Sequence, residues 1–390
     1  MINTIVLIRA RRFSKRDYER FGIDIFLKNG FKVKIIDITN IINPEIADNH
    51  KISDELSSNI VKLSDKKTAK DIFEGFGENF FVLILMPFSL DRYWIYNSIS
   101  KSKGKIGVLY TNEPIKLGKD TIKKVNYYIE LIKNYSLIDL IENLIIIIDR
   151  KFKISKFFMK PVDIVVAGGK KQINNIPYKI GEKTKICWTH TLDYDIYLKE
   201  KDIQLDKEEI AVFLDQYLPF HPDRIYGKDK KQINPEYYYS KLEEFFKLAE
   251  KELGLKVVIA AHPRSTYKDK PFFKDRKVIY GETSKLIKKS KVVIAHNSTA
   301  LNFAILYKKP IIIIKLRILN NDRSNIYTNK FAELLGKKAL TIDDFSKFNL
   351  TKELKINDEL YEKYIFDYIK ADRTKNKTSW KILIDEIKKI

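Results

Sequence analysis

The sequence predicts an α/β protein with two Rossmann-like domains that face each other across a cleft, followed by C-terminal helices. Three observations favour this class. Short runs rich in Val and Ile alternate with polar helical stretches, a pattern typical of βα repeats and of a parallel sheet with helices on both faces. The chain has 390 residues, which is long for one hydrophobic core and natural for two domains. Several apolar runs end in polar residues, at the point where open α/β sheets bind ligands.

The first series of strands and helices lies in residues 1–198, which we expect to form the N-terminal domain. A helix is expected over 14–29, because Gly30 follows it and glycine readily closes a helix. Gly168 and Gly169 permit a tight turn after the last strand of this series. The expected strands are residues 4–8, 32–39, 80–86, 105–110 and 163–169.

The second series follows a charged segment at 199–209, and we expect a second domain over residues 199–390. Its apolar runs are short and β-branched, as in strands that are buried on both faces. The expected strands are 210–214, 256–261, 277–280, 291–295 and 310–314, with a helix over 235–253 and terminal helices over 357–371 and 379–390.

The composition excludes several classes of protein. Hydrophobic residues make up 44% of the chain and aromatic residues 12%, which is enough for a folded core. The single cysteine, Cys187, excludes a disulfide framework and a cysteine-based zinc site, and it indicates a reducing compartment. The N-terminus lacks the basic start of a signal peptide, and no apolar run is long enough to span a membrane. We therefore expect a cytoplasmic protein.

The formal net charge of +22 favours anionic partners. The lysines are spread along the whole chain, and it has no arginine-rich arm, Cys/His finger or stacked-aromatic RNA motif, so we expect no nucleic-acid partner. A negatively charged substrate or an anionic lipid surface explains the charge better. Residues 137–160 combine an apolar run with Lys and Phe residues. We favour a core helix with a basic end there, and a peripheral membrane contact is the alternative.

Two strand ends carry the residue types of an anion-binding site. A hydroxyl and free backbone N–H groups at the start of a helix suit a phosphate, and an imidazole and a guanidinium add positive charge. We therefore predict a pocket for a nucleotide monophosphate or diphosphate; a buried histidine and an ordinary helix cap are the alternative. The residues concerned are His262 and Arg264 after the run at 256–261, and His296, Ser298 and Thr299 after the run at 291–295.

Other polar residues of the second domain are candidates for the same pocket. Asp215 and Gln216 end the strand at 210–214 and can hydrogen-bond a ribose or a sugar. Thr283 begins an amphipathic helix and offers a further hydroxyl. His221 follows in a Pro-rich loop, for which we favour a structural role.

These elements resemble those of the GT-B glycosyltransferases, and within that group the bacterial sialyl-, polysialyl- and Kdo-type transferases of capsule, lipopolysaccharide and glycan assembly. The segments that carry the resemblance are 213–223, 262–264, 280–283 and 296–299. It is best over 210–315 and extends to the N-terminal half only in layout. The family's His-Pro element is followed here by Arg264, and its Ser-Ser element appears as Ser298-Thr299.

The resemblance implies an inverting, metal-independent transfer of a sugar from a nucleotide donor to a bacterial surface glycan or glycolipid, with no cofactor. Residues 1–198 would bind the acceptor and residues 199–390 the donor. His262 as imidazolium, Arg264 and the helix start at Ser298 would stabilise charge on the leaving phosphate. The remaining residues implied to bind the nucleotide are Asp215, Gln216, Thr283, His296 and Thr299.

The general base is expected in the N-terminal domain. Asp17 is the leading candidate because it follows the first strand and the strongly basic loop at 9–14. His190, oriented by Asp193 or Asp195, is the alternative. Asp193 and Asp195 also match the letters of a metal-binding Asp-x-Asp element, but they lie at the domain junction, so no metal is expected. Further carboxylates considered, for each of which a solvated helix residue or cap is the plain alternative, are Glu19, Asp91 and Glu113.

The expected donor is a nonulosonate, such as a sialic or Kdo-like acid, carried on CMP. The sugar carboxylate of such a donor needs cations beyond those that serve one phosphate. A transferase using a UDP- or GDP-hexose, and a sugar-nucleotide 2-epimerase of the same fold, are the alternatives. The cations available are Arg264, Lys315, Arg317, Arg9, Arg11 and Arg12.

Overall fold

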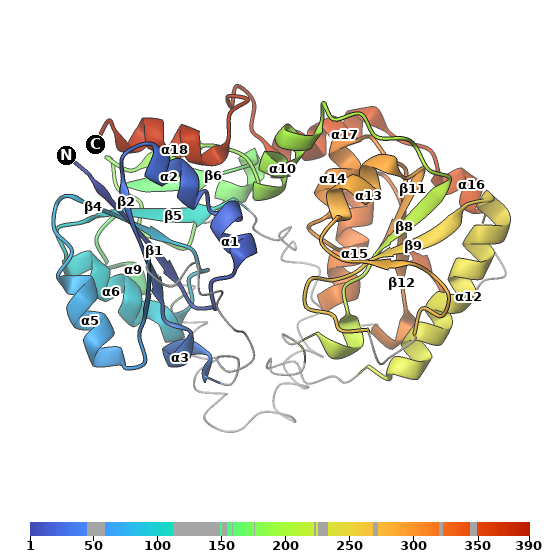
Figure 1. Cartoon of the computed structure of the whole chain (residues 1–390), viewed down its shortest axis with the longest axis horizontal. Helices are drawn as coiled ribbons and strands as arrows, with labels where there is room; N and C mark the ends of the chain where they lie inside the picture. Colours follow the sequence, from blue (N-terminus) through green and yellow to red (C-terminus); the bar gives the residue numbers. More distant parts are fainter. Residues whose placement is uncertain are drawn as a thin grey trace. The chain divides into compact units, whose positions relative to one another are not determined.

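A computed structural model describes residues 1–44, 59–111, 149, 154–157, 159–174, 176–221, 224, 233–267, 272–319, 323–343 and 349–390. The chain forms two compact units, both visible in Figure 1. Unit 1 contains the described residues up to Leu192 together with Lys370–Ile390, and unit 2 contains Asp193–Ile369. The C-terminal segment thus belongs to unit 1, whereas the sequence analysis assigned it to the second domain.

Unit 1 is built on a seven-stranded parallel sheet. Its strands are β1 (Thr4–Arg9), β2 (Lys32–Asp37), β3 (Ile60–Lys62), β4 (Phe80–Ile84), β5 (Lys105–Tyr110), β6 (Ile164–Ala167) and β7 (Lys185–Trp188). The order across the sheet is β3-β2-β1-β4-β5-β6-β7, and each neighbouring pair is parallel. Most side chains of β1, β4 and β6 are buried, as the Val- and Ile-rich runs predict.

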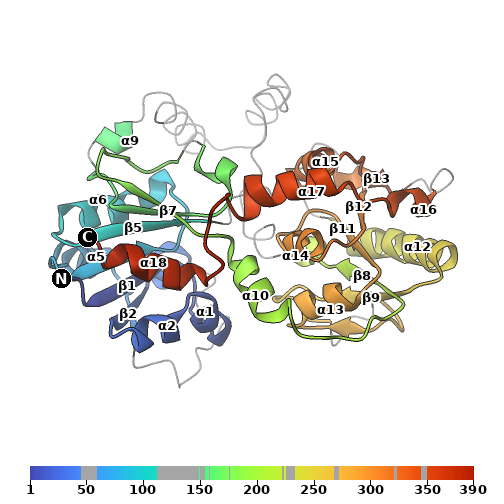
Figure 2. The same cartoon turned by 90° about the horizontal axis from the view of Figure 1, so that it is seen from above.

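Helices cover both faces of this sheet, as Figures 1 and 2 show. On one face, α5 and α6 bury Phe73 and Tyr96; on the other, α2 and α18 bury Phe26 and Trp380. The helices of unit 1 are α1 (Lys15–Arg20), α2 (Ile23–Lys28), α3 (Thr39–Ile42), α5 (Lys66–Glu74), η2 (Leu90–Arg92), α6 (Tyr93–Lys101), α9 (Ile154–Phe157), η3 (Lys170–Ile173) and α18 (Ser379–Ile387).

Helix α18 packs on unit 1 although it follows unit 2 in sequence. Trp380 is buried, its ring contacts Phe26, and its Nε1–H donates to the carbonyl of Arg20 at 2.9 Å. Gly22 lies against this ring with φ +63°, and a Cβ at Gly22 would stand 2.3 Å from Trp380. The helix predicted over 14–29 is therefore two helices, which are separated at this glycine.

Unit 2 is built on a six-stranded parallel sheet. Its strands are β8 (Ile210–Leu214), β9 (Lys256–Ala260), β10 (Val278–Ile279), β11 (Val292–Ala295), β12 (Ile311–Lys315) and β13 (Leu340–Thr341). The order is β10-β9-β8-β11-β12-β13. The chain moves outward from β8 in one direction and then returns to its other side at β11, so a topological switch point lies between β8 and β11.

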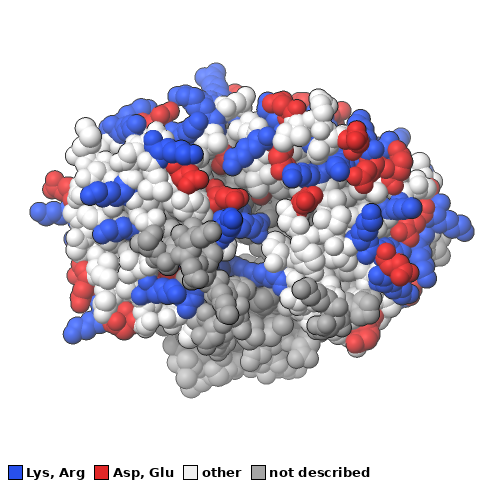
Figure 3. All heavy atoms as spheres, viewed as in Figure 1, with Lys and Arg blue, Asp and Glu red and all other residues white. Residues whose placement is uncertain are grey.

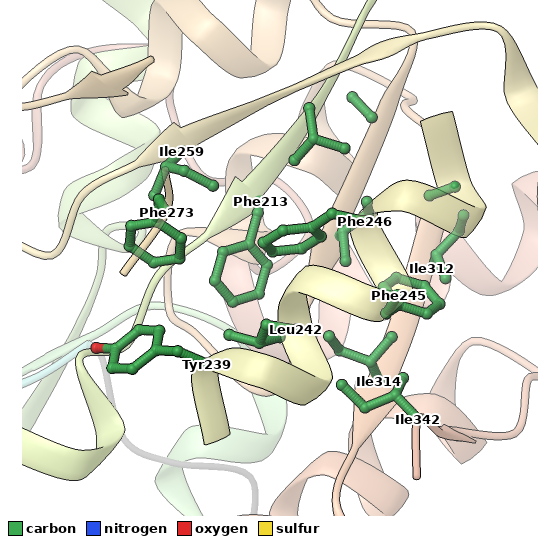
Figure 4. Packing of buried hydrophobic residues seen from close by; sticks show 14 of the residues in the cluster. Phe213, Tyr239, Leu242, Phe245, Phe246, Ile259, Phe273, Ile312, Ile314 and Ile342 are labelled. Atoms are coloured by element: carbon green, nitrogen blue, oxygen red, sulfur yellow. The ribbon is translucent and has the colours of Figure 1, made fainter. Parts of the chain in front are cut away.

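The core of unit 2 lies on both faces of its sheet. Figure 4 shows one face, where Phe246 of α12 lies beside Phe213 of β8, and Phe245 of the same helix lies beside Ile312 of β12. The ring centroids of Phe213 and Phe246 are 5.0 Å apart. The helices of unit 2 are α10 (Leu192–Glu200), which starts at the last residue of unit 1, η4 (Leu218–Phe220), α12 (Pro235–Leu253), α13 (Thr283–Lys289), α14 (Leu301–Leu306), η5 (Arg317–Leu319), α15 (Arg323–Leu334), α16 (Leu350–Glu353), α17 (Asp358–Tyr364) and the π-helical turn Ile365–Ile369.

Strands β3, β7 and β13 were not predicted. β3 and β13 lie at the edges of their sheets and have three and two residues, too few for a periodic pattern. β7 reads Lys-Ile-Cys-Trp, and only Cys187 within it is buried.

The surface carries Lys and Arg over both units, with Asp and Glu among them, on the face shown in Figure 3. Within the described part of the chain, no helix is long and apolar enough to cross a membrane. Most of the segment at 137–160 lies outside the described residues, as does Glu113; within that segment, Phe157 of α9 is 82% exposed.

Candidate functional site

The ends of three adjacent strands bring the predicted phosphate residues to one edge of the unit 2 sheet. β8 lies between β9 and β11, with Leu214 level with both Ala260 and Ala295. The polar residues after these strands therefore leave the sheet side by side. The two predicted halves of the pocket are not direct neighbours, because β8 separates them, and the residues after β8 contact both.

Asp215, the first residue after β8, is buried and accepts three hydrogen bonds from the protein. Its Oδ1 accepts the N–H of Tyr217 at 2.8 Å, and its Oδ2 accepts the hydroxyl of Tyr267 at 2.7 Å and the N–H of His262 at 3.3 Å. Burial raises the pKa of Asp215, although these hydrogen bonds act in the opposite direction. The carboxylate thus fixes the loop after β8 and the loop after β9.

His262 begins a tight turn after β9 and is half-buried. Its carbonyl accepts the N–H of Ser265 at 2.9 Å and the Ser265 hydroxyl at 2.8 Å. Its Nδ1 accepts the N–H of Arg264 at 3.2 Å. A backbone N–H can be donated only to an unprotonated ring nitrogen, so the ring proton of His262 lies on Nε2. The ring of His221 lies edge-to-face against it, with centroids 5.0 Å apart.

Gln216 and Asn297 join β8 and β11 at the switch point. The Gln216 side chain donates to the backbone carbonyl of Asn297 and to its Oδ1, and it accepts the N–H of Asn297 at 3.3 Å. Asn297 Nδ2 in turn donates to the carbonyl of Ser324 at 2.6 Å and to Thr328 Oγ1 at 2.9 Å. These bonds anchor the turn that leads to Ser298.

His296 is a core residue in this structure. Its Nδ1–H donates to the carbonyl of Ile314 at 2.8 Å, and its Nε2 accepts the hydroxyl of Tyr238 at 3.0 Å. Burial lowers its pKa to about 4, so the ring is neutral at pH 7. Both ring nitrogens bind protein groups, which favours a packing role over the predicted contact with the nucleotide.

Ser298 and Thr299 form the turn between β11 and α14. The Oγ of Ser298, a half-buried residue, accepts the N–H of Ala300 at 3.2 Å, and the residue Thr299 is exposed. Their carbonyls accept the N–H groups of Leu301 and Asn302. Ser298 thus caps the turn, and Thr299 presents its side chain at the surface.

The other predicted nucleotide contacts lie along the same edge of the sheet. Thr283 is the first residue of α13 and is half-buried, with Glu282 as the cap residue. Arg264 is half-buried in the turn that begins at His262, and Arg317 is exposed after β12. Lys315 Nζ donates to Asn329 Oδ1 at 2.9 Å.

Asp17, the leading candidate for the base, is buried in unit 1 within a local network. It lies 2.5 Å from the guanidinium of Arg9, and it accepts the hydroxyl of Ser14 at 2.7 Å in a capping box at the start of α1. Burial would raise the pKa of Asp17, but the charge of Arg9 and the bonds from Ser14 outweigh it, so the pKa is lowered. A lowered pKa makes a carboxylate a weaker proton acceptor.

His190, the alternative base, is fully buried in unit 1. Its Nε2 donates to the carbonyl of Lys377 at 2.8 Å, and its Nδ1 lies 3.1 Å from the hydroxyl of Ser379. These contacts attach the C-terminal segment to the end of β7. Asp193, expected to orient His190, accepts the side-chain amide of Asn302 at 3.0 Å, and both Asp193 and Asn302 belong to unit 2.

The remaining carboxylates are weaker candidates for the general base. Glu19 is exposed, and the side chain of Asp91 is 67% exposed. Asp195 is buried in unit 2. Within the described ranges, no group of three or more His, Cys, Asp or Glu side chains could hold a metal ion.

Sequence reasoning missed the parts played by Asn297, Tyr267 and His221. Asn297 lies between two residues that were selected, so its position at the strand end was a usable signal. Tyr267 bonds to Asp215, which lies 52 positions earlier in the chain. His221 contacts His262 only because of the way the loop after β8 folds. Neither contact could be recognised from a local sequence pattern.

No protein-family model matches the chain, and no curated protein matches its sequence. Solved structures do resemble it. One is an S. aureus MnaA–UDP co-structure, with a TM-score of 0.50 and 11% identity over 100% of this chain and 96% of that chain. Another is a provisionally assigned UDP-N-acetylglucosamine 2-epimerase from Listeria monocytogenes, with a TM-score of 0.50 and 12% identity over the same shares. The wall teichoic acid polymerase TagF has a TM-score of 0.49 and 13% identity over 99% of this chain and 88% of that chain.

At these identities the likeness concerns the fold. Two parallel sheets of seven and six strands in Rossmann-like units, with C-terminal helices, make a GT-B-type fold. The predicted fold class is confirmed in these respects.

Proposed function

We propose that this protein is an enzyme that uses a nucleotide-activated sugar, and that it is an inverting, metal-independent glycosyltransferase. One observation carries the proposal: His262, Arg264 and Ser298 lie at the edge of the unit 2 sheet beside its switch point. Open α/β sheets bind nucleotides at such points. The fold supports the proposal, because the S. aureus MnaA co-structure of the same fold contains UDP.

The chemistry required at this edge is stabilisation of the leaving phosphate. His262 would donate to a phosphate oxygen through Nε2, because its Nδ1 already accepts the N–H of Arg264. Arg264 would supply positive charge, and Thr299 and Thr283 hydroxyl groups. The hydrogen bonds of Gln216 and Asp215 to the protein favour a positioning role for both.

The proposed donor remains a CMP-linked nonulosonate, with a bacterial surface glycan or glycolipid as acceptor. Arg264, Lys315 and Arg317 follow strands β9 and β12 in unit 2, and such cations suit the carboxylate of the sugar. An enzyme with this acceptor would work at the inner face of the cytoplasmic membrane, where the high positive charge would favour contact with anionic lipid. The local networks around Asp17 and His190 weaken the case for both as the base that takes the acceptor's proton.

A sugar-nucleotide 2-epimerase is the second candidate, and it is favoured by the likeness of the fold to the Listeria monocytogenes structure provisionally assigned as a UDP-N-acetylglucosamine 2-epimerase. An epimerase would invert a UDP-sugar at C2 with no acceptor present. Incubation of the purified protein with a UDP-sugar, followed by NMR of the sugar, tests this candidate directly. Inversion at C2 would contradict the transferase proposal.

A thermal-shift screen of CMP, UDP, GDP and TDP tests the proposed function. A ligand that binds the folded state raises the melting temperature by mass action, and we expect CMP to give the largest shift. Stabilisation by UDP or GDP without stabilisation by CMP would overturn the proposed donor but keep the nucleotide site. No shift with any nucleotide would overturn the proposal.

With the nucleotide identified, His262→Ala should lower turnover by about two orders of magnitude at an unchanged melting temperature.

A further inference from the structure

The loop that follows β8 contains a strained residue. Tyr217 has φ 53° and ψ 35°, a left-handed conformation that is unfavourable for a bulky side chain. Its ring is buried against Phe220 and Tyr267, with centroids 5.2 and 5.3 Å away. Strained residues persist only where the surroundings hold them, and they concentrate at functional sites. The packing around Tyr217 therefore holds the loop after β8 in this strained conformation.

The strained loop positions His221. The 3₁₀ turn η4 begins directly after Tyr217 and ends at Phe220, whose ring packs on Phe272 at 5.7 Å. His221 follows, and its ring lies 5.0 Å from that of His262 at an interplanar angle of 65°. Both residues are half-buried. The loop thus places a second imidazole beside the residue that the strand end already provides.

Asp215 fixes both imidazole-bearing loops at once. One carboxylate oxygen accepts the N–H of Tyr217 on the His221 side, and the other accepts the N–H of His262. The His262 ring is oriented further by the N–H of Arg264. Hydrogen bonds thus hold the backbone of both loops next to the ring pair, as preorganised binding sites require.

We propose that His221 is a second phosphate-binding residue, and that His221 and His262 together bind the phosphoryl group of the nucleotide. This inference rests on the proposed function and adds a residue to its site. Each imidazole can donate an N–H to a different oxygen of one phosphoryl group, and bonds to a charged acceptor are strong. Because the loops are already fixed, little ordering cost accompanies binding.

Aromatic packing alone also produces edge-to-face pairs, and that role predicts a different result. His221→Phe keeps an aromatic ring beside His262 but removes both ring nitrogens. If His221 only packs, this variant should bind nucleotide as the wild type does. If His221 binds phosphate, the affinity for the nucleotide should fall while the affinity for the nucleoside, which has no phosphate, stays the same.

The experiment is calorimetry on the full-length protein with the nucleotide that gives the largest thermal shift, and with its nucleoside. We expect His221→Phe to weaken nucleotide binding about tenfold, the loss of one hydrogen bond to a charged group, and to leave nucleoside binding unchanged. His221→Gln, which retains an N–H donor, should recover part of the loss. Lys256→Ala is the control, because this exposed lysine starts β9 at the opposite edge of the sheet.

The outcomes separate this inference from the proposed function. If the wild type binds no nucleotide, both fail. If His262→Ala weakens nucleotide binding and His221→Phe does not, only the role of His221 is overturned. An equal loss of nucleotide and nucleoside affinity in His221→Phe, or a lowered melting temperature that accounts for the loss, would assign His221 to packing and likewise overturn it.

Discussion

Asp215 illustrates how a single buried side chain organises the proposed site. Its position at a strand end could be predicted from the sequence, because the apolar run before it ends clearly. Its partners could not: Tyr267 and His262 come from distant parts of the chain. A contact with a ribose is what position alone predicts. The carboxylate accepts three hydrogen bonds from protein groups, which favours a role in positioning the two histidine loops over a contact with ribose.

Asp17 is expected to contribute to stability. Its pKa is lowered in the folded protein, mainly through Arg9 and Ser14 acting against burial, so its contribution is present above the unfolded-state pKa and is lost as the pH falls through the folded-state value. We expect Asp17→Asn to lower the free energy of unfolding by about 1–2 kcal/mol at pH 7. Urea titrations at pH 7 and at successively lower pH should show this difference disappearing.

Asp91→Asn is the matched control, because the Asp91 side chain is largely exposed. It should change the free energy of unfolding by less than about 0.5 kcal/mol. A difference between Asp17→Asn and the wild type that persists at low pH would contradict the assigned network.

His296 should give the stability of the protein a second dependence on pH. Unlike Asp17, which loses a negative charge on protonation, His296 gains a positive charge. Its pKa is lowered from 6.5 to about 4 by burial, so the unfolded chain binds a proton that the folded protein does not. Stability should therefore fall as the pH drops from 6.5 towards 4, by about 3 kcal/mol from this residue. His296→Phe loses two hydrogen bonds at pH 7 but should lack this acid-dependent loss. Parallel slopes of stability against pH for variant and wild type would contradict it.

At the scale of elements, the strands that could be predicted from the sequence are those formed by continuous apolar runs. β8, β9, β11 and β12 were placed to within a residue or two, because each is a buried β-branched run. The break between α1 and α2 was missed, because its cause is the ring of Trp380, which arrives from the far end of the chain. Local pattern contains no information about such a partner.

Gly22 and Gly30 form a pair that separates backbone strain from steric overlap. Both have positive φ, but a Cβ at Gly30 meets nothing within 4 Å, whereas one at Gly22 would overlap Trp380. We expect Gly30→Ala to cost about 1–2 kcal/mol and Gly22→Ala about 3–4 kcal/mol. Equal losses in thermal or urea unfolding would show that α18 does not hold this position.

At the scale of the whole molecule, the fold class was predictable because βα alternation runs through both units. The assignment of residues 370–390 to unit 1 could not be predicted, because the contacts of this segment with unit 1 join residues hundreds of positions apart, as in the hydrogen bond from Trp380 to Arg20. The site was predicted as a set of strand ends, and the structure adds the connections among them.

The proposed chemistry predicts that activity does not require a divalent metal. Histidine, arginine and threonine hydroxyl groups at the unit 2 edge would stabilise the leaving phosphate in place of an ion. Turnover measured after treatment with EDTA and desalting should match that of the untreated enzyme. Loss of activity that is restored by magnesium or manganese would contradict the proposed site.

The placement of α18 makes unit 2 an insertion within unit 1, since Asp193–Ile369 separates two parts of the same unit. On the ribosome, unit 2 is synthesised completely before the residues that cover α2 emerge. Unit 2 can therefore fold first, whereas unit 1 must wait with Phe26 and its neighbours uncovered. We therefore expect unit 2 to complete its folding before unit 1, although synthesis begins with unit 1.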